Sequence, residues 1–322
     1  MRPHIILRRF RSSSRSLRRW PSPTKLKVFG ANMLNANTIS KSFGLLRRIG
    51  STAMAASVAL SFFAPPLLAA SPAETFAASA QGSTARIDHG AWDKLLKTFV
   101  VPGSDRINRV AYARFKSEGH AALKQYVASL EAVDVAALDR PEQFAFWANL
   151  YNAKTIDIVL DKYPVKSIKD INLGGGLLTL VTGGPWKAKV VKVNGQDLSL
   201  DDIEHGILRP VFKDPRVHYA VNCASFGCPN LGTEALTGAR LEAQLDDAAK
   251  AYVNHPRGIR VSDGKVKASS IYSWFQSDFG GSDKGVLAHV KSFAAPELKA
   301  KLDAASGIAD YDYDWLLNDA GK

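Results

Sequence analysis

Both cysteines of the chain, Cys223 and Cys228, lie in one short segment that also contains His218 and Asn222. A cysteine acts as a nucleophile when a base or a positive dipole within hydrogen-bonding reach lowers the pKa of its thiol. The segment is therefore a candidate site for thiol chemistry, with Cys223 as the nucleophile. The same two cysteines, separated by four residues, can equally form a disulfide that closes a tight turn before Pro229.

Two histidines could serve as the base for this thiol. Residues 217–222 alternate in a way that predicts a buried strand, central in a sheet, with apolar side chains on both faces. On such a strand His218 and Cys223 point to opposite faces, so they can meet only if the strand ends or bulges. His205 is not bound by this alternation and is the better candidate base, with Glu204 as the group that orients it.

Zinc binding is a further possibility for the same region. His205, His218, Cys223 and Cys228 are all possible zinc ligands by residue type. Their spacing does not match the tight cysteine and histidine pairs of structural zinc sites. We therefore expect no metal and no other cofactor.

Asn149 and Asn152 lie one turn apart on the apolar helix predicted over residues 141–163. Buried amides must be hydrogen-bonded. Asn149 and Asn152 could therefore line the floor of a pocket and orient a substrate amide or a catalytic imidazole. The favoured alternative is that they hold a neighbouring loop through its backbone.

The charge of the chain is concentrated at its N-terminus. The 322 residues carry a formal net charge of +12, and residues 1–50 contain twelve basic side chains and no acidic one. Subtracting these twelve from +12 leaves zero for residues 51–322. The body therefore has no overall field that would attract a polyanion, and we expect no nucleic-acid partner.

The basic segment continues into a secretory leader. Arg47 and Arg48 precede an apolar run, Ala53–Ala70, and small residues follow it. The run is broken by prolines and is shorter than the ~20 apolar residues of a membrane span. We expect cleavage between residues 70 and 80, a periplasmic or secreted protein, and no membrane contact afterwards. The alternative is a retained N-terminal anchor.

The chain divides into a basic extension and signal peptide (1–70), a linker (71–88) and a single globular domain (89–322). Helices are predicted near 92–99, 119–137, 141–163, 200–208, 239–253 and 270–275. Hairpins are predicted at Asn194-Gly195 and Asp263-Gly264, and an edge strand near 310–315. The Gly-rich stretch 165–185 is typical of a loop or lid. These elements predict an α+β domain in which N-terminal helices and a mixed or antiparallel sheet pack on a buried central helix.

Several segments in order resemble the domain of unknown function 547 family, from about Phe144 to Asn318. The matching motifs are residues 146–155, 201–209, 214–229, 273–280 and 311–315. The resemblance implies an exported bacterial member without an established activity. It nominates these positions as functional: Asn149, Asn152, Glu204, His205, Arg209, His218, Asn222, Cys223 and Cys228.

A weaker resemblance, at the level of fold, is to the papain and transglutaminase-like group. There a buried helix packs against a strand that carries a catalytic histidine, as predicted here for His218. The helix position that holds a cysteine in those enzymes is a non-thiol residue in this chain.

Two functional hypotheses follow. The first is a thiol-dependent hydrolase or acyl transferase acting on an amide or peptide substrate. Cys223 would be its nucleophile and His205 or His218 its base, and the residues that orient substrate would be Asn149, Asn152, Asn222 and Arg209. The second is a non-catalytic module that binds a small molecule, a peptide or a protein and is closed by a Cys223–Cys228 disulfide. The sequence leaves the choice between them, and the oligomeric state, open.

Overall fold

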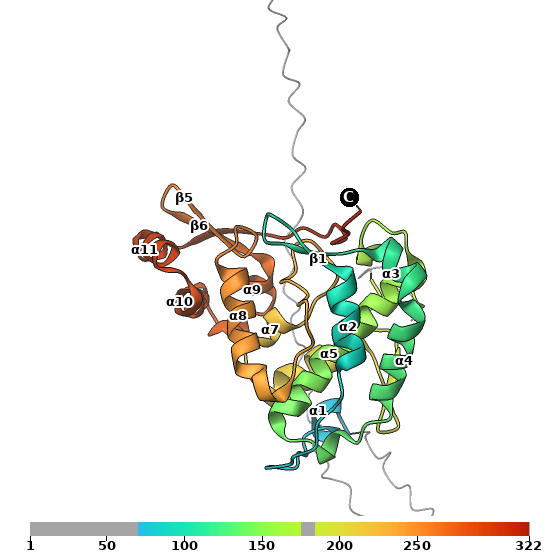
Figure 1. The fold of residues 1–322 in the computed structure, drawn as a ribbon. Coiled ribbons are helices and arrows are strands. Elements are labelled where there is room, and N and C mark those ends of the chain that lie inside the picture. Colours follow the sequence, from blue (N-terminus) through green and yellow to red (C-terminus); the bar gives the residue numbers. More distant parts are fainter. Residues whose placement is uncertain (1–69, 175–183, 322) are drawn as a thin grey trace, which may run out of the picture. The chain divides into compact units, whose positions relative to one another are not determined.

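One long helix, α5 (Arg140–Lys162), runs through the middle of the helices (Figure 1). The Asp139 side chain caps it by accepting the backbone N–H of Glu142 at 3.0 Å, and Pro141 lies in its first turn. Its side chains are buried on nearly every side. The prediction of a buried central helix is confirmed in this computed structural model, which describes residues 70–174 and 184–321.

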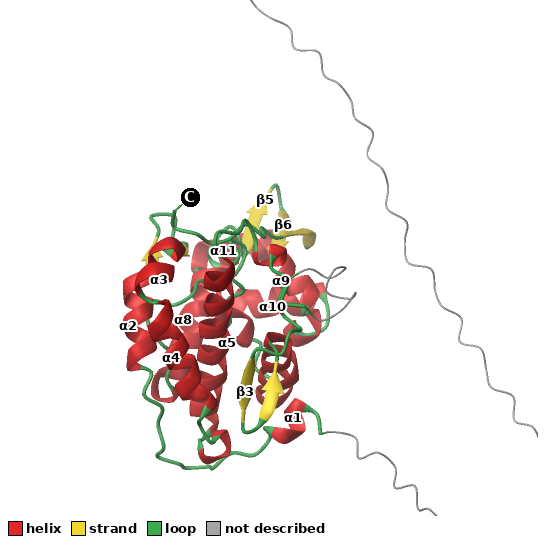
Figure 2. Cartoon of the chain, turned by 90° about the vertical axis from the view of Figure 1, so that its right-hand side faces the viewer, coloured by secondary structure: helices red, strands yellow, loops and turns green. Residues whose placement is uncertain are grey.

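Three helices cover one side of α5 (Figure 2): α2 (Gly90–Phe99), α3 (Tyr112–Glu118) and α4 (His120–Glu131). Both α3 and α4 contact α5 directly, and α2 packs on α3 and α4. Their apolar faces and that of α5 form the larger of two hydrophobic cores. A short 3₁₀ turn, η1 (Val135–Ala137), leads into α5.

A second core is built from the C-terminal third of the chain. It joins helices α8 (Leu241–Val253), α9 (Ser270–Trp274), α10 (Asp283–Phe293) and α11 (Pro296–Ala304) to a three-stranded sheet. In that sheet β6 (Lys265–Ser269) is antiparallel to β5 (Ile259–Ser262) and parallel to β7 (Ile308–Asp312). The sheet is therefore mixed, and β7 is its edge strand, as predicted.

Two small hairpins complete the strands. One pairs β1 (Val100–Pro102) with β2 (Asn108–Val110), and the other pairs β3 (Val191–Val193) with β4 (Gln196–Leu198). Asn194 and Gly195 have positive φ angles of 48° and 80°, as a type I′ turn requires. Both hairpins predicted from Asn-Gly and Asp-Gly pairs are confirmed, and the domain is α+β.

The predicted central strand over residues 217–222 is wrong. Val217–Ala220 form a single helical turn, α7, and the chain becomes extended only at Val221. The turn is started by Asp214, whose carboxylate accepts the backbone N–H of Arg216 at 2.8 Å. Apolar residues on both sides of a short segment fit a buried helical turn as well as a strand, so the alternation was not decisive. His218 therefore lies on a helical turn and not on a strand, so the feature on which the resemblance to papain and transglutaminase-like enzymes rested is absent at this position.

The helix predicted after Leu200 is confirmed in a wider form. It is the π-helix η3 (Asp202–Phe212), and Ser199 exchanges hydrogen bonds with Asp202 at its start. A short helix near the beginning of the described chain, α1 (Pro72–Thr75), packs on η3. The following Phe76 is buried, with its ring centroid 4.8 Å from that of Trp147.

Residues 1–69 of the predicted leader lie outside the described residues, as do residues 175–183 of the predicted loop or lid. The described part of the lid region contains one 3₁₀ turn, η2 (Ile168–Asp170). Among the described residues, no helix has both the length and the apolar character that crossing a membrane requires.

Candidate functional site

One pocket gathers most of the residues nominated from the sequence. Its cavity volume is ≈ 170 Å³, which is more than isolated waters need but less than a drug-sized ligand fills. Its walls come from α5, η3, α7, the turn between the two cysteines (residues 223–228, called the cysteine turn), α9 and residues 313–315 near the C-terminus. We call it the aromatic pocket because six of its lining residues are aromatic: Tyr151, Trp186, Trp274, Phe275, Tyr313 and Trp315.

His218 lies at the wall of this pocket and is held by two carboxylates. Its Nε2 is 2.8 Å from Oδ2 of Asp278, and its Nδ1 is 3.8 Å from Oε1 of Glu204. Phe275 stacks on the imidazole with ring centroids 4.2 Å apart. The hydrogen bond at Nε2 and the stacking on one ring face therefore fix the orientation of the side chain, and Nδ1 faces Glu204 beyond hydrogen-bonding distance.

Asp278 joins His218 to Arg209. The Arg209 guanidinium donates to both carboxylate oxygens of Asp278, at 2.6 and 3.0 Å. Burial alone would raise the pKa of Asp278, but the hydrogen bonds from His218 and Arg209 outweigh it and hold that pKa well below the ordinary value. Asp278 is therefore ionised, and its charge is shared between two donors.

Two other carboxylates line the pocket from η3 and the residue before it. Glu204 is 8% exposed, and its carboxylate interacts with the buried hydroxyl of Tyr151, whose pKa is raised mainly by burial and further by the Glu204 charge. Burial raises the pKa of Asp201, and the Glu204 charge raises it further, although His205 acts in the opposite direction. His205 lies between them, with Nε2 3.9 Å from Asp201 and Nδ1 3.9 Å from Glu204.

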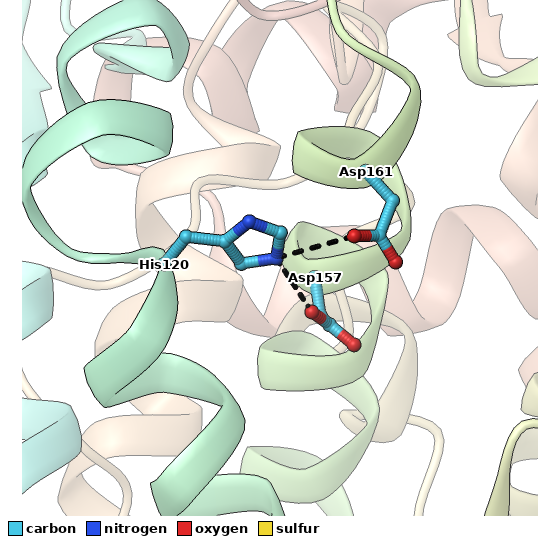
Figure 3. A group of neighbouring side chains, drawn as sticks. All are labelled: His120, Asp157 and Asp161. Carbon is cyan, nitrogen blue, oxygen red and sulfur yellow. Dashed lines mark hydrogen bonds and ion pairs between the residues drawn. The ribbon is translucent and has the colours of Figure 1, made fainter.

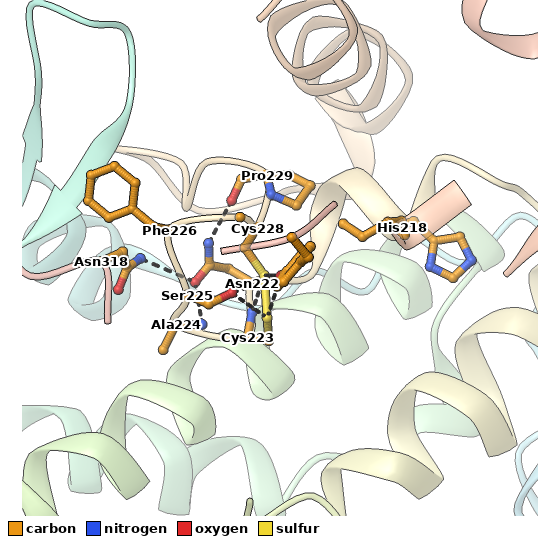
Figure 4. The surroundings of a disulfide bond; sticks show 12 residues. His218, Asn222, Cys223, Ala224, Ser225, Phe226, Cys228, Pro229 and Asn318 are labelled. Atoms are coloured by element: carbon orange, nitrogen blue, oxygen red, sulfur yellow. Dashed lines mark hydrogen bonds between the residues drawn. A yellow bond between two sulfur atoms is a disulfide. The ribbon is translucent and has the colours of Figure 1, made fainter. Parts of the chain in front are cut away.

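The two cysteines lie at disulfide distance in a tight turn (Figure 4). The Tyr313 hydroxyl is 3.1 Å from Sγ of Cys223 and 3.2 Å from Sγ of Cys228. Among the described residues neither histidine is hydrogen-bonded to a sulfur, and in Figure 4 the His218 ring points away from the pair. The arrangement contains a sulfur pair and a fixed imidazole, but not a thiol–imidazole dyad.

The side chains of Asn149 and Asn152, which the sequence nominated, are hydrogen-bonded to the backbone of neighbouring segments. Asn149 exchanges two hydrogen bonds with the backbone of Leu236, at 2.8 and 3.1 Å. Asn152 donates to the Ala220 carbonyl at 2.8 Å and accepts the N–H of Asn222 at 2.7 Å.

Asn222 continues this arrangement immediately before the cysteine turn. Its amide donates to the carbonyl of Pro229 at 2.6 Å and accepts the N–H of Ala224 at 2.8 Å (Figure 4). Ala224 has a positive φ of 59°, a conformation that this bond helps to hold. The asparagine is thus part of the framework that fixes the two sulfur atoms.

The structure therefore separates the nominated residues into two groups. Glu204, His205, His218, Cys223 and Cys228 line the aromatic pocket, and Arg209 reaches it through Asp278. Asn149 and Asn152 line a second cavity, of ≈ 270 Å³, which shares none of its lining residues with the first. Asn222 is buried between the segments that line them.

A further cluster of metal-ligand types lies on the far part of α5. His120 faces Asp157 and Asp161 (Figure 3), with Nε2 2.7 Å from the Asp157 carboxylate. Lys124 and Lys154 also contact Asp157, at 2.9 and 2.8 Å. Two lysines thus neutralise the two carboxylates, and the cluster is a salt-bridge network between α4 and α5.

The comparison with protein families gives one match. Residues 135–253 match the family described as "Protein of unknown function, DUF547". The match confirms, over these residues, the resemblance to this family that the sequence suggested. No curated protein and no solved structure matches the chain.

The DUF547 match spans α5, η3, α7, the cysteine turn and α8, and so contains every residue nominated from the sequence. The resemblance that the sequence suggested for residues 254–318 lies beyond it. That later part supplies Trp274, Phe275, Asp278, Tyr313 and Trp315, which complete the aromatic pocket or its histidine support.

These residues after 253 lie within motifs that resemble the family, but the sequence alone indicates no role for any of them. Asp278 is 60 residues from His218 in the chain, and only the folded structure brings the two together. Clusters of tryptophan and tyrosine at 274 and 311–315 were the signal that could have indicated an aromatic wall.

Proposed function

We propose that this DUF547 domain is a ligand-binding module whose site is the aromatic pocket. The observation that carries the proposal is a concave site with six aromatic side chains and the buried carboxylate of Glu204 at its wall. Ligand sites in proteins are concave, mostly apolar and equipped with a few fixed polar groups. The ligand would be a small molecule or a side chain of a peptide, as the cavity volume suggests.

The competing hypothesis, a thiol-dependent hydrolase or acyl transferase, has less support. It requires a free thiolate at Cys223 with a base in reach. The sulfur of Cys223 lies at disulfide distance from that of Cys228, and its hydrogen-bond neighbours are the hydroxyls of Ser225 and Tyr313. The nitrogens of His218 face carboxylates instead.

An exported location is part of the proposal. The basic and apolar leader supports it, and so does the cysteine pair, because disulfides persist in oxidising compartments. Cleavage would fall close to Ala70, since the residues that follow contact the domain. Phe76 packs on Trp147, and the Gln143 side chain donates to the carbonyl of Ala78 at 2.8 Å.

The test is a fragment screen on the full chain, followed by intrinsic tryptophan fluorescence and ligand-observed NMR. Trp274 is 48% exposed at the pocket, so Trp274→Ala should fold normally and abolish binding of the fragments that the wild type takes. Val101, an apolar residue of β1 that is 43% exposed, provides the control Val101→Ala, which should leave binding unchanged.

A thiol count on the native protein separates the two hypotheses. Alkylation and intact mass should find both sulfurs blocked until a reductant is added. A free Cys223 that is alkylated rapidly near neutral pH, together with no fragment whose binding depends on Trp274, would reject the binding module in favour of the enzyme.

A further inference from the structure

The charges around the aromatic pocket indicate what kind of ligand it takes. Asp201 and Glu204 are its acidic lining residues, and no lysine or arginine of the described chain lines it. The nearest guanidinium, that of Arg209, is already paired with Asp278 through two hydrogen bonds. An incoming group therefore meets two acidic side chains at a wall to which the described residues contribute no lysine or arginine.

Glu204 is the more informative of the two, because its carboxylate is nine-tenths buried and, apart from the neutral Tyr151 hydroxyl, no hydrogen-bonded partner of basic type is found for it among the described residues. Its nearest nitrogens are Nδ1 of His218 at 3.8 Å and Nδ1 of His205 at 3.9 Å, both beyond hydrogen-bonding distance. Burying a carboxylate without a basic partner is costly. A cation placed in the pocket would offset that cost and the repulsion between Glu204 and Asp201.

The aromatic walls suit the same ligand. Trp274, Tyr313 and Trp315 surround one side of the pocket, with ring centroids 4.7 to 5.6 Å apart. The faces of such rings attract cations. Two aromatic residues of the pocket already do so within the protein, because the Lys169 ammonium lies 5.0 Å from the Trp315 ring and the Arg209 guanidinium 4.8 Å from the Phe275 ring.

We propose that the aromatic pocket binds an organic ammonium group, seated between the Glu204 carboxylate and the wall formed by Trp274, Tyr313 and Trp315. The inference rests on the proposed function and names its ligand class. The cavity of ≈ 170 Å³ suits a compact cationic head group, and the rest of the ligand would extend into solvent.

The experiment compares two ligands of the same shape by isothermal titration calorimetry on the full chain. Choline carries a quaternary ammonium, and 3,3-dimethylbutan-1-ol has the same shape with a carbon in place of the nitrogen. Choline should bind about tenfold more tightly, or better, because the neutral alcohol gains neither the cation–π attraction nor the attraction to Glu204.

Variants locate the charge that matters. Glu204→Gln should weaken choline about tenfold and leave the alcohol unchanged, since the amide keeps the shape and removes the charge. Asp197, on β4, provides the matched control, because its side chain is 63% exposed and lies outside the pocket. Asp197→Asn should bind both ligands as the wild type does.

A third ligand distinguishes a free quaternary ammonium compound from the lysine side chain of a peptide. A blocked lysine amide, tested in the same way, presents the primary ammonium of a peptide side chain. Tighter binding of choline would assign the pocket to a free quaternary head group, and tighter binding of the lysine amide to a peptide.

Failure of this inference is distinguishable from failure of the proposed function. Equal affinity for choline and the alcohol, or no effect of Glu204→Gln, would overturn the cationic ligand while leaving a pocket that binds. No binding of either ammonium ligand would overturn it too, and the proposed function would then stand or fall on whether any fragment in the screen depends on Trp274.

Discussion

Two polar networks share the segment that runs from α7 through the cysteine turn, and they are built in opposite ways. In the asparagine network (Asn149, Asn152, Asn222) each side-chain oxygen and nitrogen is bonded to backbone. In the carboxylate–histidine network (Glu204, His218, Asp278, Arg209) the Asp278 end is fully paired. Glu204 faces the aromatic pocket beside the Tyr151 hydroxyl, and no basic side chain of the described residues is hydrogen-bonded to it.

This difference separates groups that hold the structure from groups that are available to a ligand. A buried amide with all its partners in place contributes to stability and fixes the path of the chain. A buried carboxylate without a basic partner costs stability, and proteins keep such groups where binding compensates for them. Substitution of a fully paired group should therefore lower the free energy of unfolding. Substitution of Glu204 should leave it unchanged or raise it.

The largest effect is expected in the asparagine network. Asn152→Ala leaves the Ala220 carbonyl and the Asn222 N–H buried without partners, so the free energy of unfolding should fall by about 3 kcal/mol. Urea denaturation at neutral pH measures the change. The exposed Asn172 makes one local hydrogen bond, and Asn172→Ala should cost no more than about 0.5 kcal/mol. A loss below about 1 kcal/mol in Asn152→Ala would show that these bonds do not hold the turn.

Sequence reasoning succeeded where the signal is local. The cap at Asp139 with Pro141 predicted the start of α5, and the Asn194-Gly195 pair predicted a hairpin, because neighbouring residues decide both. The alternating residues 217–222 gave a wrong strand, since burial on all sides removes the difference between the two periodicities.

The candidate site was only partly predictable for a related reason. The cysteines and His218 lie close together in the sequence, so their segment could be nominated directly. The contact of His218 with Asp278 and the aromatic wall around Trp274 and Trp315 depend on how the second core packs against α7. No short-range pattern in the sequence specifies that packing.

A smaller loss is expected at the paired end of the carboxylate–histidine network. Asp278→Asn removes the charge to which the partly buried Arg209 and the buried His218 are hydrogen-bonded. The free energy of unfolding should fall by about 2 kcal/mol at neutral pH. Because the pKa of Asp278 is depressed in the folded protein, its stabilisation is complete above the ordinary value of ~3.9 and is lost as pH falls through the depressed value.

The difference between wild type and Asp278→Asn should therefore shrink as pH falls below about 4. Urea denaturation at neutral pH and at pH ~3 measures it, with Asp197→Asn as the exposed control. A difference that stays constant down to pH ~3 would mean that the loss arises from altered packing and not from the carboxylate charge.

The smallest effect, of opposite sign, is expected at Glu204. Glu204→Gln replaces a buried carboxylate that lacks a basic hydrogen-bond partner among the described residues by a neutral group of the same shape, which can still accept from the Tyr151 hydroxyl. The free energy of unfolding should therefore stay constant or rise by up to about 1 kcal/mol. Urea denaturation of the ligand-free protein measures this change, and Asn152→Ala in the same series provides the contrast. A loss of more than about 1 kcal/mol would place Glu204 with the asparagines as a structural group and remove the distinction between the two networks. Unchanged or increased stability together with weaker choline binding would identify Glu204 as a group retained for its ligand.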